Sequence, residues 1–85
     1  MIASKTVQQL INDCPANFTD TQPVSEWLAE AYRWAEIEDH PEVKEAAWLG
    51  MAKIDILDAR RQYRETVLSQ LKAIAAISVI NSGEG

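Results

Sequence analysis

The chain has 85 residues, of which 47% are hydrophobic and 25% are charged, with only three glycines and three prolines. This composition predicts one small globular domain over residues 1–85 and argues against a wholly disordered chain. Thirteen acids against eight bases give a net charge of −5, which disfavours binding to nucleic-acid phosphates and to anionic membranes. A chain this short buries a small share of its surface, so protein partners are an expected source of stability.

The first predicted helix covers residues 4–14, with Ser4 as its N-cap. Its apolar residues recur at the spacing that places side chains on one helical face: Val7, Leu10, Ile11 and Cys14. Pro15 ends the helix because the residue before a proline avoids the helical conformation. Residues 15–24 are rich in Asn, Thr, Asp and Pro and predict a loop.

A second helix is predicted over residues 25–39, with Ser25 as its N-cap. Its apolar residues form one wide arc and are the predicted core of this helix: Trp27, Leu28, Ala31, Trp34 and Ala35. Asp39 and Glu42 have the spacing of a capping box for the next helix, whose first turn tolerates Pro41.

A third, long helix is predicted over residues 41–80, because Gly50 is its only helix-weakening residue. Two apolar stripes flank a polar stretch at residues 58–65, so a turn near Arg60 is an alternative to one continuous helix. Residues 81–85 predict a frayed tail. The predicted fold class is therefore all-α: a small hairpin or bundle of three helices.

The C-terminal third of the chain carries more apolar surface than two short companion helices can cover. Residues 73–80 are almost wholly apolar, and burying each large side chain among them contributes about 1.5–3 kcal/mol. We therefore expect self-association or a protein partner, with a minor alternative in which residues 77–80 add a strand. The predicted protein interface is formed by Leu68, Leu71, Ile74, Ile77, Ile80 and Trp48.

Charge is distributed unevenly along the chain. Residues 25–45 hold seven acids and two bases, whereas residues 46–72 hold five bases and three acids. One interpretation is that the acidic helix folds back on the basic segment, with exposed ion pairs that set orientation. The other is that an acidic face binds a basic partner, as in inhibitors that phages use to block nucleic-acid-binding complexes. The predicted acidic face consists of Glu36, Glu38, Glu42 and Glu45.

A basic patch of Arg60, Arg61 and Arg64 is the second charged feature. Guanidinium groups match phosphate oxygens, so this patch predicts weak nucleic-acid binding. A salt-bridged surface or a register-setting polar layer between helices is the competing interpretation.

Catalytic signatures are absent from the sequence. Cys14 and His40 are the only cysteine and histidine, and each stands next to a proline rather than in a known motif. We expect no catalytic residue, metal or cofactor, and hence no enzyme. The longest apolar run is too short for a membrane span and Met1–Leu10 lacks a secretory apolar region, so a cytoplasmic location is expected. The predicted function is non-enzymatic protein binding as an adaptor, assembly or regulatory factor that acts through helix–helix association, as a homo-oligomer such as a homodimer.

Overall fold

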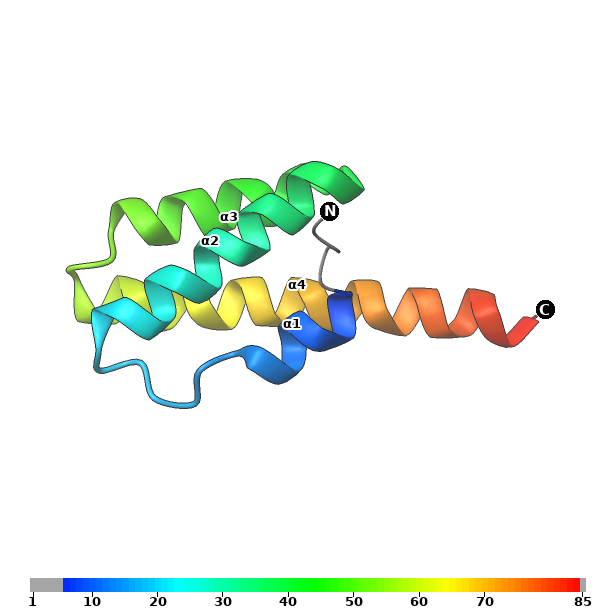
Figure 1. Ribbon diagram of the computed structural model, residues 1–85, viewed down its shortest axis with the longest axis horizontal. Helices are drawn as coiled ribbons and strands as arrows, with labels where there is room; N and C mark the ends of the chain where they lie inside the picture. The colour runs from blue at the N-terminus through cyan, green and yellow to red at the C-terminus, as the bar shows by residue number, and fades with distance from the viewer. Residues whose placement is uncertain (1–5, 85) are drawn as a thin grey trace, which may run out of the picture.

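In the computed structural model, residues 6–84 are described, and their side chains as far as residue 77. Within these residues the chain is helical and contains no strand, which confirms the all-α class (Figure 1). The helices are α1 Val7–Asp13, α2 Thr21–Glu38, α3 Pro41–Ala52 and α4 Leu57–Glu84. Four helices thus replace the predicted three, because the predicted long helix is divided into α3 and α4.

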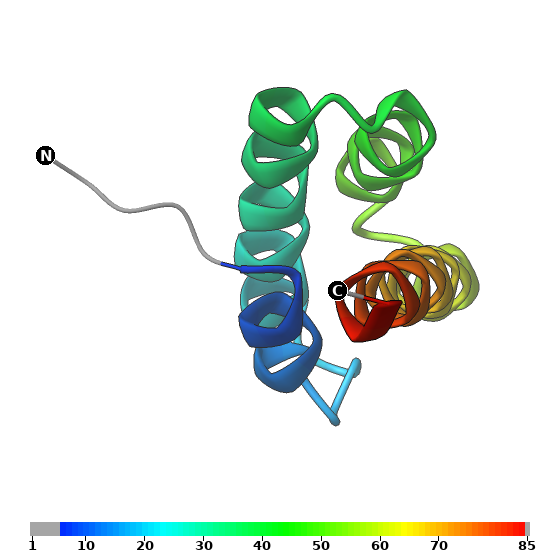
Figure 2. The ribbon, with the colours of Figure 1, turned by 90° about the vertical axis from the view of Figure 1, so that its right-hand side faces the viewer.

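The helices enclose one core. Helices α2 and α3 form an antiparallel hairpin (Figure 1). Helix α4 lies against α3, with α1 alongside α4 (Figure 2). Every helix contributes a side chain to this core, and the largest fully buried ones are Leu10, Val24, Leu28, Val43, Val67 and Leu71. Beyond this packed region, the C-terminal part of α4 extends past the other helices (Figure 1).

The first two helices begin at other residues than predicted. The predicted N-cap Ser4 lies outside the described residues, and α1 is capped by Thr6, whose hydroxyl accepts from the Gln9 N–H at 3.1 Å. Helix α2 begins four residues before Ser25. Pro23 therefore lies in its first turn, where backbone N–H groups have no acceptor within the helix.

The connection between α2 and α3 also differs from the prediction. Asp39 does not cap α3; it ends α2 in the left-handed conformation, at φ 64° and ψ 57°. The N-cap of α3 is His40, and Pro41 is the first helical residue. The His40 ring stacks on Trp34 with the ring centroids 5.0 Å apart. Trp34 and Trp27 are buried in the core, as predicted.

The break between α3 and α4 falls at residues 53–56, which contain neither glycine nor proline. Ile54, Asp55 and Ile56 are weak helix formers, because β-branched side chains lose rotamer freedom and Asp competes for backbone bonds. Residues 58–65, where a turn was the alternative, are continuous helix instead. Leu57, the first residue of α4, is 49% exposed. At its other end α4 continues past the predicted limit at residue 80.

Gly50 is buried where α2, α3 and α4 meet. A Cβ at this position would lie 2.9 Å from both Leu28 Cδ1 and Tyr63 Cβ. Leu28 can turn its terminal carbon away, but Tyr63 Cβ is fixed to the backbone of α4. Glycine is thus required here by the close approach of two helices.

We expect Gly50→Ala to destabilise the protein although alanine favours a helix by about 1 kcal/mol. Overpacking against Tyr63 costs about 1–3 kcal/mol, so the free energy of unfolding should fall, by at most about 2 kcal/mol. Urea denaturation followed by circular dichroism measures this change. A clear gain in stability would show that the α3–α4 contact is looser than described.

Candidate functional site

The predicted basic patch lies on the buried stripe of α4. Arg60 and Arg64 precede Val67 and Leu71 at alternating spacings of four, three and four residues, which keep side chains on one helical face. Val67 and Leu71 are fully buried beneath the other helices, and Arg60 is only 5% exposed. The two arginines therefore face the fold rather than the solvent.

Arg60 donates three hydrogen bonds to backbone carbonyls. Its Nε bonds the Ile54 carbonyl at 2.8 Å, and its Nη1 bonds the carbonyls of Phe18 and Thr19 at 3.0 and 2.9 Å. One guanidinium thus joins the α3–α4 turn to the loop between α1 and α2. These bonds compensate the cost of burying the charge, and they leave Arg60 poorly placed to bind phosphate.

Arg64 holds the other end of the same loop. Its Nη1 donates to the Pro15 carbonyl at 3.0 Å and lies 3.4 Å from Cys14 Sγ, and its guanidinium stands over the Phe18 ring at 5.4 Å. Burial raises the pKa of the Cys14 thiol, and the hydrogen bond and charge of Arg64 oppose this rise. Cys14 is half-buried, in partial agreement with its predicted place on the apolar face of the first helix.

Arg61 is separated from the other two arginines. It is exposed and forms an ion pair with Asp58 at 3.6 Å, one turn earlier on the same helix. The three arginines are consequently not assembled into a single surface. Arg60 and Arg64 instead resemble the polar layer that was the competing interpretation, although their partners are a loop and a turn rather than a helix.

The four carboxylates of the acidic face are exposed on the α2–α3 hairpin. Glu36 pairs with Lys44 at 3.6 Å, and Glu42 lies 3.9 Å from His40 Nδ1. These partners belong to the hairpin itself. Since Arg60 and Arg64 bond to the loop, they do not serve as partners for this face.

The predicted apolar interface on α4 is divided between core and surface. Leu71 is fully buried, Leu68 and Ile74 pack partly against the core, and Ile77 is 59% exposed. The side chain of Ile80 lies outside the described residues. The expectation that this whole stripe is uncovered was wrong for Leu71, because α1 lies against it.

Trp48 of the predicted interface lies elsewhere, on α3, and is 55% exposed. It lines an open groove between α2 and α3 together with Tyr32, Pro41, Lys44 and Glu45. Tyr32 was not predicted as a site residue, because only the turn at Asp39 brings it next to the first turn of α3.

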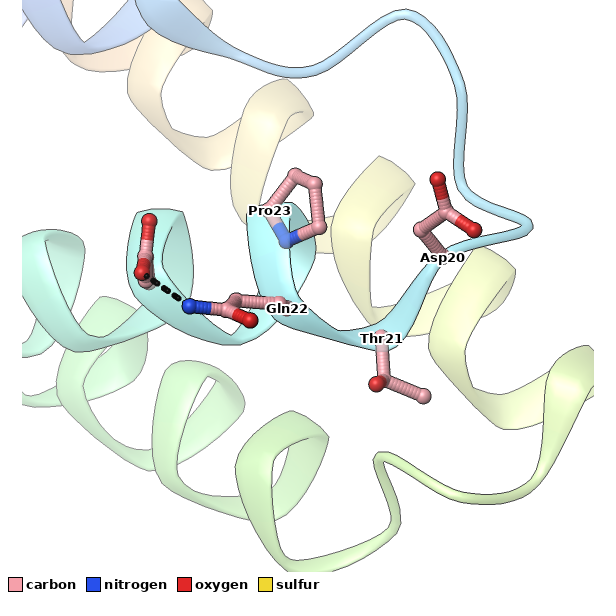
Figure 3. A pocket seen from close by; sticks show the side chains of 5 residues that line it. Asp20, Thr21, Gln22 and Pro23 are labelled. Atoms are coloured by element: carbon pink, nitrogen blue, oxygen red, sulfur yellow. Dashed lines mark hydrogen bonds between the residues drawn. The ribbon is translucent and has the colours of Figure 1, made fainter.

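A second hollow lies at the start of α2 and is lined by Asp20, Thr21, Gln22, Pro23 and Glu26. Gln22 Nε2 donates to Glu26 Oε2 at 3.0 Å, and Figure 3 shows the labelled side chains pointing in different directions. These groups do not converge on a common point, so the hollow offers no evident ligand site.

Comparison with family models, curated proteins and solved structures finds no match for the chain. Within the described residues, no three side chains of the metal-binding types stand together as a metal site. None of the helices in the same part of the chain has both the length and the apolarity to cross a membrane.

Replacing Arg60 should destabilise the protein far more than replacing Arg61. Arg60→Met leaves three carbonyls without their donor, so we expect the free energy of unfolding to fall by about 3 kcal/mol. Arg61→Met removes an exposed pair and should change it by less than about 0.5 kcal/mol. Urea denaturation of both variants makes the comparison, and equal losses would contradict the anchoring role of Arg60.

Cys14 should make stability depend on alkaline pH. Because burial raises the pKa of the folded thiol, its contribution is complete below the ordinary thiol pKa and is lost as pH rises through the folded value. We expect unfolding curves to show a steeper alkaline loss of stability for the wild type than for Cys14→Ala. Parallel pH profiles of the two proteins would contradict a raised pKa.

Proposed function

We propose that this chain is a non-enzymatic protein-binding protein that acts through helix–helix association and forms a homo-oligomer. The observation that carries this proposal is Ile77, which belongs to the C-terminal part of α4 and is 59% exposed. This part of the helix extends beyond the other helices (Figure 1). A large apolar side chain in that position gains free energy from burial in an intermolecular contact.

The sequence around Ile77 supports a second copy as the partner. Between Lys72 and Glu84 the helix carries no charged residue, so two copies of this segment meet without charge repulsion between them. Ala73 and Ala76, which share the exposed surface with Ile77, are small enough to allow close approach of a facing helix. A two-fold contact buries the same surface on both copies and is the commonest arrangement of homo-oligomers.

The proposal predicts that Ile77→Gln weakens self-association. Sedimentation velocity from low to high micromolar concentration should show the wild type shifting to a larger species and the variant remaining smaller. Ile56→Gln is the matched control, because Ile56 is 57% exposed in the α3–α4 turn at the opposite end of the molecule (Figure 1).

A wild-type protein that stays monomeric at high micromolar concentration would contradict the proposal. If Ile56→Gln and Ile77→Gln weakened self-association equally, the contact between copies would not be formed by the C-terminal part of α4.

A further inference from the structure

The groove between α2 and α3 carries a second inference, which is independent of association through α4. Its walls combine aromatic, apolar and charged groups: Tyr32 from α2, and Pro41, Lys44, Glu45 and Trp48 from α3. We propose that this groove binds an arginine side chain presented by a basic segment of a partner protein, with the guanidinium stacked on Trp48 and paired with Glu45.

Trp48 is the feature that marks the groove as a binding surface. It is 55% exposed, whereas Trp27 and Trp34 are 3% and 7% exposed. The core therefore does not use the indole of Trp48. Tryptophan is enriched among the residues that dominate binding energies, and its ring face attracts a cation more strongly than that of any other side chain.

The charge of the hairpin specifies a cationic partner. Residues 25–45 hold seven acids and two bases. Of these acids, Glu45 lines the groove and Glu36 pairs with its Lys44, and both are exposed. The groove's own cation is already balanced, since Lys44 lies 3.6 Å from Glu36 and 5.5 Å from the centre of the Tyr32 ring. Trp48 and Glu45 offer a second cation the same combination of an aromatic face and a carboxylate.

Arginine fits this combination better than lysine or an apolar residue. A guanidinium is planar, stacks on an aromatic ring and bonds a carboxylate through two N–H groups. A purely apolar segment would cover Glu45 and Lys44 without replacing their hydration, which is costly. Nucleic acid is disfavoured because its phosphates meet a surface of like charge.

The test is a heteronuclear NMR titration of the full chain with an amidated peptide that alternates arginine and glycine. We expect the indole N–H signal of Trp48 to shift while that of Trp27, which donates to the Leu10 carbonyl in the core, stays in place. Trp48→Ala and Glu45→Gln should each weaken binding by about two- to fivefold. Higher salt should weaken binding further.

Matched variants separate the groove from general attraction to the acidic hairpin. Glu38→Gln removes the same charge outside the groove, and Ile37→Ala removes an exposed apolar side chain of α2. Glu38→Gln should weaken binding less than Glu45→Gln does, and Ile37→Ala should bind as the wild type does. Equal weakening by Glu38→Gln and Glu45→Gln, or an unmoved Trp48 signal, would overturn the proposal.

Control ligands test the other possible occupants. Equal binding of a leucine–glycine peptide would assign the groove to apolar segments, and preferential binding of a glutamate–glycine peptide would assign it to acidic ones. A Trp48 signal that shifts with protein concentration alone would assign it to a second copy. Each of these results would overturn arginine recognition. The titration is run at a protein concentration below that of self-association, where Ile77→Gln should leave it unchanged.

Discussion

The buried guanidinium of Arg60 is the interaction on which the arrangement of the other segments depends. It connects the loop before α2, the turn before α4 and α4 itself through three carbonyl groups. Carbonyls in a loop and a turn lack the N–H donors that a helix provides, and a buried guanidinium lacks water as an acceptor. The guanidinium therefore donates to these carbonyls, and both groups are hydrogen-bonded. Arg64 donates to the Pro15 carbonyl at the other end of the loop. The two arginines thus fix the loop along α4, and α1, which precedes the loop, lies against α4.

The position and length of α1 then decide which part of α4 remains exposed. Seven helical residues span about 10 Å, and within that length α1 helps to enclose Val67 and Leu71. Ile74 is already only partly buried, and Ile77 is largely exposed. The proposed association surface therefore begins after Leu71, in the part of α4 that α1 no longer covers. It is narrower than the apolar stripe in the sequence, because the loop anchored by the two arginines extends the core along α4.

Apolar spacing predicted the class of the fold and the buried face of α2, from Trp27 to Ala35, because that face follows from local periodicity. The break after α3 could not be predicted in the same way, since its stabilising bond joins Ile54 to a side chain six residues later. One signal was available: Arg60 and Arg64 continue the stripe of Val67 and Leu71, a position that favours burial. For the candidate sites, the sequence identified Trp48 and the acidic residues, but the groove also needs Tyr32, which the left-handed turn at Asp39 brings into place.

The two proposed surfaces face the same end of the molecule, which links their energetics. The α2–α3 connection and the free end of α4 both lie toward the right of Figure 1. Two copies that pair through α4 therefore bring their acidic connections closer together, and like charges oppose the pairing. Salt screens this repulsion without weakening the apolar contact, and a cationic segment in the groove neutralises it locally. If both proposals hold, binding at either surface would favour binding at the other through a shared coupling free energy.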